Sequence, residues 1–303
     1  MKEVFVPKKF QAKTLRVVEQ ANTVIAEYDA LGFILTLRQL FYQFVARELL
    51  ANTQQSYKRL GWVLSEARLA GEIDWDAIED RTRETARWQS WSSPSETIEE
   101  AARTYAENPW LGQKVLPFVW IEKSALVNVI EDVCSRWHVA YFACRGFSSQ
   151  TELYNSGREF QRLLRNGITP IVLHLGDHDP SGIFMTRDNA ERLELFTRQQ
   201  VEVRRIALNL DQVRQLPPNP AKENDSRYGA YIKEFGTPKC WELDALDPST
   251  IAGLVDPEIK KLVNKRKWQT AKARELRNRG LLQATFRNWI MIENFLAAKE
   301  KLS

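Results

Sequence analysis

Hydrophobic positions in the first part of the chain recur at intervals of three and four residues, which is the spacing of amphipathic helices. Residues 10–30 have this pattern and are predicted to form a helix. A second helix is predicted to begin after Thr36, because Thr36 and Gln39 occupy the N-cap and N3 positions of a capping box. A third helix is expected over residues 53–70, which end before a glycine.

The segment after these helices, residues 72–83, is short and has the pattern of extended chain. Three helices followed by such a segment are typical of a winged-helix domain, which we predict over residues 1–83. In that fold the third helix enters a DNA groove. Its basic residues are therefore candidate DNA contacts: Lys58, Arg59 and Arg68. A plain helical bundle is the alternative.

Beyond residue 116 the pattern changes to short apolar segments that alternate with helical ones. Nearly continuous apolar strands separated by helices are typical of a parallel sheet covered on both faces. We therefore predict an α/β fold for residues 117–256. The predicted strands are residues 117–122, 138–143, 171–175 and 201–208, with 240–246 expected to be a last strand.

Two further segments flank the predicted α/β domain. Residues 84–116 are expected to be a connecting segment with one helix, which begins after Ser93 because a proline and an acid occupy its first turn. Residues 257–303 are predicted to be helical and basic, since residues 260–301 contain twelve lysines and arginines against three acids. Such a tail is suited to phosphate binding, although a solvated helix would have the same charge.

The composition excludes several classes of protein. No apolar run reaches the ~20 residues that a membrane helix requires, and the N-terminal residues lack the apolar core of a secretory signal. We therefore expect a cytoplasmic, nucleoid-associated protein that does not enter a membrane. The three cysteines are too few and too far apart for a disulfide framework or a zinc site. Any bound metal is expected to be a hard, oxygen-ligated ion.

Three acidic residues follow the ends of predicted strands. Glu122 ends the first strand, while Asp177 and Asp179 follow the third strand after Gly176 and flank His178, which we expect to point away from them. Because ligand sites in open α/β sheets lie beyond the carboxyl ends of the strands, the three carboxylates are expected to converge. Clustered carboxylates raise one another's pKa unless a cation neutralises them, and Mg²⁺ prefers such oxygen ligands. The sequence therefore predicts a magnesium site.

The segments IEKSA (121–125), ACRGFSS (143–149) and LGDHDPSG (175–182) resemble a Toprim domain. The similarity is to the A subunit of topoisomerase VI and its relative, the meiotic double-strand-break transesterase, and to compact mini-A proteins of bacteria and mobile elements. It covers residues 30–250 approximately. The resemblance implies a winged helix before the Toprim domain and cleavage of the DNA backbone. The implied Mg²⁺ ligands and catalytic acids are Glu122, Asp177 and Asp179.

The resemblance also points to a nucleophile in the second predicted helix. In the family a tyrosine ends a pattern like Arg-Asp-Ile-Tyr-Tyr, which corresponds here to Arg38-Gln39-Leu40-Phe41-Tyr42. Tyr42 is then the attacking residue, and Arg38, one helical turn earlier on the same side, would help to activate it. Helical geometry turns Tyr42 by about 100° from Phe41 and off the apolar stripe. A tyrosine half-buried against a neighbouring helix is the non-catalytic alternative.

Several other polar residues are candidates for DNA contacts. Those expected near the phosphate backbone are Lys123, Ser148, Ser149 and Lys222. The alternatives are a solvated lysine at 123 and an ordinary turn around the two serines. Glu242 and Asp244 are expected to have a structural role rather than to bind the metal.

Three functions are compatible with these residues. The first is cleavage of double-stranded DNA by tyrosine transesterification. The second is a hydrolytic Toprim nuclease, as in SMC-type defence complexes, with Tyr42 as a bystander. The third is a DNA-binding scaffold without catalysis. The first implies a homodimer and, because the sequence contains no P-loop, a separate ATPase subunit of the GHKL or SMC type.

Overall fold

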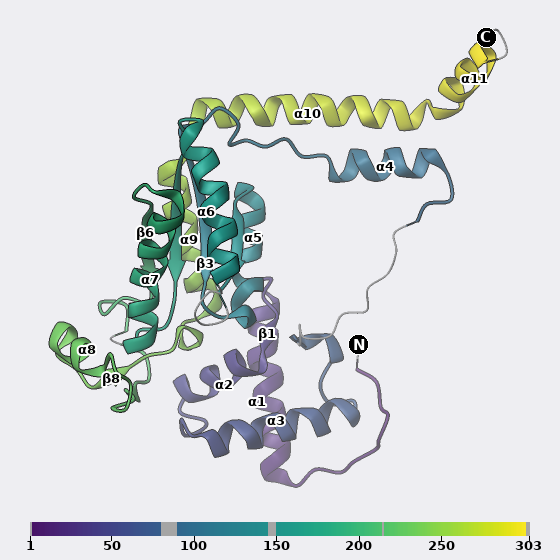
Figure 1. Ribbon diagram of the computed structural model, residues 1–303. Helices are drawn as coiled ribbons and strands as arrows, with labels where there is room; N and C mark the ends of the chain where they lie inside the picture. Colours follow the sequence, from purple (N-terminus) through teal and green to yellow (C-terminus); the bar gives the residue numbers. More distant parts are fainter. Residues whose placement is uncertain (1, 80–89, 145–149, 214, 301–303) are drawn as a thin grey trace. The chain divides into compact units, whose positions relative to one another are not determined.

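The computed structural model describes residues 2–79, 90–144, 150–213 and 215–300 (Figure 1). The chain divides into two compact units, which combine the predicted segments in a different way from the sequence-based division. The predicted helical domain and the predicted sheet belong to one unit, and the predicted linker and basic tail belong to the other. The units are Met1–Arg83 with Val115–Leu262, and Glu84–Lys114 with Val263–Ser303.

The first unit begins with the three predicted helices, α1 (Ala12–Asp29), α2 (Leu37–Ala46) and α3 (Gln54–Leu69). The capping box before α2 is confirmed: the Gln39 backbone N–H donates to the Thr36 hydroxyl over 3.3 Å, and the Thr36 N–H donates to the Gln39 side chain over 2.7 Å. Because these bonds satisfy free N–H groups of the first turn, the helix begins where the sequence predicts. Buried apolar residues from all three helices form one core.

The segment predicted as a wing is described only in part. Its residues up to 79 contain the 3-10 turn η1 (Trp75–Ala77) and the short strand β2 (Ile78–Glu79), which pairs in parallel with β1 (Leu35–Thr36). Residues 80–83 lie outside the described residues. This strand pairing therefore places the end of the described segment next to β1, which directly precedes α2.

The predicted parallel sheet is confirmed, with four strands in the order β4-β3-β5-β6. Helices α6 and α7 pack against each other and against β5 and β6, while α5 and α9 form a second packed pair (Figure 1). Helices therefore flank the sheet, which explains why its central strands are largely apolar. The elements are β3 (Val115–Ile121), β4 (Ala140–Ala143), β5 (Thr169–Leu175), β6 (Glu202–Ala207), α5 (Val127–Trp137), α6 (Gln150–Arg165), α7 (Pro180–Thr197) and α9 (Pro248–Leu262).

The expected last strand over residues 240–246 is wrong for most of its length. Only Lys239–Cys240 (β8) is a strand, antiparallel to β7 (Asn219–Pro220), and the 3-10 turn η3 (Leu243–Ala245) follows. The backbone N–H of Leu243 donates to the Asp177 side chain over 2.7 Å instead of to a neighbouring strand. Two short helices complete the unit: η2 (Ser124–Leu126) and α8 (Tyr228–Phe235).

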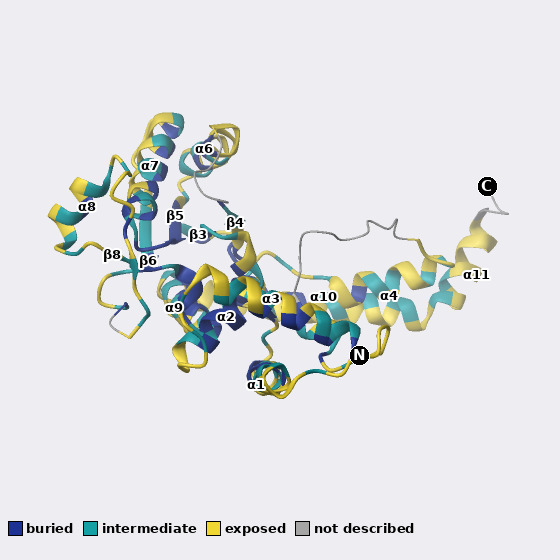
Figure 2. Cartoon of the chain, turned by 90° about the horizontal axis from the view of Figure 1, so that it is seen from below, coloured by how far each residue is buried: buried dark blue, intermediate teal, exposed yellow. Residues whose placement is uncertain are grey.

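The second unit consists of α4 (Pro94–Thr104) packed against the long helix α10 (Lys265–Arg287), followed by α11 (Trp289–Glu300). Buried Glu275 of α10 accepts the backbone N–H of Glu107 over 3.0 Å. Most of α10 and α11 is exposed or half-buried (Figure 2). No helix within the described ranges combines the length and apolar character needed to cross a bilayer.

Candidate acidic site at the ends of the central strands

The central strands β3 and β5 end side by side. Ile121 pairs with Leu175, and the Glu122 backbone N–H donates to the Leu175 carbonyl over 2.8 Å. The residues that follow the two strands are therefore neighbours. The Glu122 carboxylate accepts the backbone N–H of Asp177 over 2.8 Å, so two of the three predicted acids lie in the same place although they are far apart in sequence.

Gly176 permits this close approach. A Cβ atom at Gly176 would lie 2.9 Å from the Glu122 carboxylate oxygen and 3.3 Å from Nη1 of Arg205. Both distances are shorter than ordinary van der Waals contacts, so any side chain here would displace the Glu122 carboxylate. A glycine is therefore needed before the two aspartates, because it leaves room for the Glu122 carboxylate.

Asp179, the third predicted acid, is the N-cap of α7. Its carboxylate accepts the Gly182 backbone N–H over 2.6 Å, and Pro180 occupies the first turn. Gly182 is required by packing, because a Cβ atom there would lie 2.3 Å from the Asp177 carbonyl oxygen. The Asp-Pro-Ser-Gly sequence therefore folds the loop tightly and starts the helix in one step.

His178 points away from the two aspartates, as expected from the sequence. Its ring is buried, and Nδ1 lies 2.8 Å from the Tyr231 hydroxyl. Its backbone also forms an antiparallel bridge with Trp241, with hydrogen bonds of 2.8 and 3.0 Å. Burial lowers the pKa of the His178 imidazole to about 4, so the ring is neutral at pH 7. The neutral His178 ring and its backbone bridge to Trp241 therefore hold the acidic loop in place.

Burial and mutual repulsion act on the carboxyl groups of this site. The pKa of Glu122 is raised, first by burial and then by the charge of Asp177, with a smaller contribution from Asp179. The pKa of Asp177 is raised by burial, against the opposing effect of Lys123. Asp177 is only 8% exposed. Such crowded carboxylates favour the binding of a cation.

The donor chemistry fits a hard divalent ion such as Mg²⁺, which prefers carboxylate oxygens. The site contains five acids and three bases. If all eight groups are ionised, two negative charges remain uncompensated, and one divalent cation would balance them. In the part of the chain that the structure describes, no group of three or more histidines, cysteines, aspartates and glutamates is arranged as a metal-ligand set. The five acids and three bases of the site are Glu122, Asp177, Asp179, Glu242, Asp244, Arg38, Lys123 and Arg205.

Lys123 and Arg38 join the acidic loop to η3 and α2. The Lys123 ammonium lies 3.0 Å from Asp177 Oδ1, 3.1 Å from Glu242 Oε2 and 3.3 Å from Asp244 Oδ1. The Arg38 guanidinium pairs with Glu242 and lies 2.7 Å from Asp244 Oδ2. Glu242 and Asp244 are therefore ion-paired with Lys123 and Arg38, and these pairs link α2 to the acidic loop.

Arg205, on β6, was missed by the sequence analysis. It is largely enclosed, and its guanidinium donates to the carbonyl groups of Gly176 over 2.9 Å, Asp177 over 2.5 Å and Gly182 over 3.1 Å. Burial lowers the pKa of Arg205 to about 10, so it remains charged at pH 7. Its position inside a strand of a parallel sheet, where apolar residues are usual, was the available indication in the sequence.

Tyr42 lines the same cavity as Asp177 and Asp179, whereas Glu122 is not among the described residues that line it. The cavity is about 660 Å³ in volume, and its wall includes Arg38, Lys123, Asp177 and Asp179. Tyr42 lies off the apolar stripe only in part, because the residue is 4% exposed and packs against Phe41 with ring centroids 5.7 Å apart. Burial raises the pKa of the Tyr42 phenol, and nearby Arg38 and Lys123 oppose this effect. Arg38 and Tyr42 both line this cavity.

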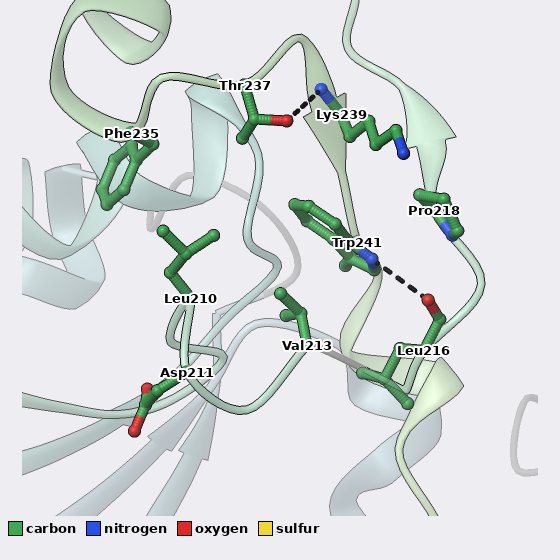
Figure 3. Close-up of a pocket in the computed structure, with 9 residues that line it drawn as sticks. All are labelled: Leu210, Asp211, Val213, Leu216, Pro218, Phe235, Thr237, Lys239 and Trp241. Atoms are coloured by element: carbon green, nitrogen blue, oxygen red, sulfur yellow. Dashed lines mark hydrogen bonds between the residues drawn. The ribbon is translucent and has the colours of Figure 1, made fainter.

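A second pocket of about 880 Å³ lies beside the first and shares Trp241 with it. Its walls come from residues 210–218 and 235–241, with residue 214 outside the described part (Figure 3). The Trp241 indole N–H donates to the Leu216 carbonyl over 3.3 Å, which fixes the ring between the two pockets. Among the described residues lining this pocket is none of the predicted site residues.

The predicted DNA contacts have different environments. Lys58 and Arg59 are exposed on α3, and exposed Lys222 lines the acidic cavity. Arg68 instead donates to the carbonyl groups of Trp75 over 2.9 Å and Ile78 over 2.5 Å, so it holds the segment after α3. Ser148 and Ser149 lie outside the described residues.

No protein-family model matches the chain, no curated protein matches its sequence, and no solved structure matches its fold.

Proposed function

We propose that the protein cleaves the DNA backbone at a Toprim-type acidic site, with the N-terminal helices acting as a winged-helix DNA-binding part. The contact between the Glu122 carboxylate and the Asp177 backbone, at the ends of two adjacent parallel strands, carries the proposal. Asp179 follows in the same tight loop. This is the arrangement in which separate carboxylates can act on one phosphodiester.

Glu122, Asp177 and Asp179 would hold Mg²⁺. When bound, the ion would neutralise charge on a phosphoryl oxygen and stabilise the leaving alkoxide. The role of the remaining residues is to position the strand. Lys58 and Arg59 are exposed cations that would bind phosphates of double-stranded DNA, and Lys222 would do so at the cavity.

We infer that Tyr42 is the nucleophile, since it lines the cavity that contains Asp177 and Asp179. The phenol oxygen would form a bond to phosphorus as the phosphorus–O3′ bond breaks. The phenol proton passes to solvent, the O3′ leaving group takes up a proton, and the products are a 5′-phosphotyrosine and a free 3′-hydroxyl. The positive charge of nearby Arg38 would favour the phenolate form of Tyr42.

Hydrolysis is the second candidate function, and the burial of Tyr42 favours it. A phenol that is 4% exposed and has a raised pKa is a weak nucleophile. Water activated at the acidic site would then attack in its place, and Tyr42 would only line the cavity. The partners implied by the first function, a second copy of the chain and a GHKL or SMC-type ATPase, belong to the proposal for transesterification.

The test is incubation of the protein with internally labelled, supercoiled plasmid DNA and Mg²⁺, followed by denaturation and detection of DNA attached to protein. We expect adduct formation by the unmodified protein and by Tyr57→Phe, a matched tyrosine that lines the same cavity. We expect no adduct with Tyr42→Phe, and no cleavage with Asp177→Asn, which keeps the acceptor for Leu243.

The same experiment separates the candidate functions. Mg²⁺-dependent nicking by Tyr42→Phe without any adduct would establish hydrolysis. DNA binding without cleavage by any form of the protein would leave a non-catalytic scaffold.

A further inference from the structure

The Lys123 ammonium lies among the acids of the site. It is 3.0 Å from Oδ1 of Asp177, a proposed metal ligand, and it also contacts Glu242 and Asp244, which are not proposed ligands. The Lys123 side chain is 21% exposed, and that of Asp244 is 1% exposed. One lysine thus spans two groups of carboxylates that have different roles.

This geometry places two cations in competition for one carboxylate. Asp177 Oδ1 already accepts the Leu243 N–H, so its remaining acceptor capacity is limited. An ammonium at 3.0 Å repels a divalent ion bound to the same carboxylate, whichever of the two oxygens the ion uses. The ammonium in this position therefore opposes metal binding at Asp177.

The structure also provides the place to which Lys123 can withdraw. Glu242 and Asp244 lie 3.1 and 3.3 Å from the same ammonium, and Arg38 holds them in position from α2. A lysine has a flexible four-carbon stem, which allows its ammonium to shift toward these two carboxylates and away from Asp177. The charge of the ammonium is compensated in both positions.

We propose that Lys123 is the internal counter-cation of the acidic site, which competes with the divalent ion for Asp177 and remains paired with Glu242 and Asp244 once the ion is bound. The proposal rests on the metal site of the proposed function. It assigns to Lys123 a control of metal affinity, in addition to any contact with phosphate.

The test measures the binding of Mn²⁺ alone, in the absence of DNA, by isothermal titration calorimetry. We expect Lys123→Gln to bind Mn²⁺ about fivefold more tightly than the unmodified chain, because a partly buried ammonium no longer opposes the metal ion. The matched control is Lys222→Gln, which removes the same charge from the same cavity at an exposed lysine. It should leave the affinity within about twofold, since surface charges are well screened.

Folding of the variants is checked by circular dichroism. Lys123→Met, which keeps the length and apolar stem of the side chain, replaces Lys123→Gln if the latter does not fold. An unchanged or weaker Mn²⁺ affinity in a folded Lys123 variant overturns the proposal, and so does an equal gain in Lys222→Gln. If the unmodified chain and the Lys123 variants all bind no Mn²⁺, the metal site of the proposed function itself is refuted.

Discussion

Arg38 on α2 and Asp244 in η3 form a direct ion pair, with 2.7 Å between Nε and Oδ2. The Asp244 side chain is 1% exposed, whereas that of Arg38 is 44% exposed. The pair joins two segments that are distant in sequence, and α2 contacts η3 in the folded chain. Its arginine comes from the helix that also carries Tyr42, so the pair sets the distance between that helix and the acidic site.

Replacement of Arg38 by methionine should destabilise the fold. It leaves a buried carboxylate with Lys123 as its remaining ion-pair partner, and we expect the free energy of unfolding to fall by about 1–3 kcal/mol. Urea unfolding at pH 7 provides the measurement. Arg47→Met is the matched control, because Arg47 pairs with exposed Glu27 and such a pair contributes at most about 1 kcal/mol. Equal losses in the two variants would contradict the structural role of Arg38.

Gly182→Ala should disrupt the loop that carries the aspartates. The new Cβ would lie 2.3 Å from the Asp177 carbonyl oxygen, and backbone has to move to relieve the clash. We expect a loss of about 1–3 kcal/mol in the free energy of unfolding. Gly253→Ala in α9, where the Cβ meets nothing within 4 Å, should instead stabilise the helix by about 0.5–1 kcal/mol. Thermal unfolding of the two variants would show opposite shifts, and a loss in both would exclude this explanation.

His174 should contribute to acid sensitivity. It is fully buried in β5, with Nδ1 2.9 Å from the Thr186 hydroxyl, and burial lowers its pKa to about 3. A base with a lowered folded-state pKa favours folding above its ordinary pKa of about 6.5, and this contribution is lost as the pH falls from there toward 3. His174→Gln should therefore show a smaller loss of stability between pH 7 and pH 5.

Urea unfolding at the two pH values tests this prediction. His138→Asn provides a control at a half-buried histidine whose left-handed backbone conformation asparagine tolerates. An unchanged pH dependence in His174→Gln would show that the imidazole does not limit stability in acid.

The exposed basic residues of α10 should add an electrostatic contribution to DNA binding. Arg266, Arg274 and Arg277 are all exposed, and Arg274 also pairs with Glu107 within the second unit. If Arg266 and Arg277 both contact phosphates, Arg266→Gln with Arg277→Gln should reduce the slope of log K against log salt by about 1.8. Fluorescence anisotropy with a duplex at several salt concentrations gives this slope. Arg274→Gln should leave it unchanged, and an unaltered slope in the double variant would mean that α10 is only solvated.

Much of the secondary structure was predictable because it depends on neighbouring residues. Thr36 and Gln39 satisfy each other's backbone groups within one turn, and Ser93 caps α4 in the same local way. The alternation of apolar strands with helices likewise follows from burial on both faces of a sheet. The strand expected over 240–246 was wrong, because the backbone of Leu243 bonds to an aspartate 66 residues away.

The sequence by itself determined the helix caps, the parallel α/β pattern and the positions of Glu122, Asp177 and Asp179 at strand ends. Tertiary structure alone decided that Arg205 donates hydrogen bonds to the acidic loop, that Lys123 and Arg38 share Glu242 and Asp244, and that α4 packs against α10. The physical reason is the distance along the chain between the groups that interact. Caps and periodicity are set by groups within a few residues, whereas the partner of a buried charge is chosen by which distant segments the packed core brings within a few ångströms.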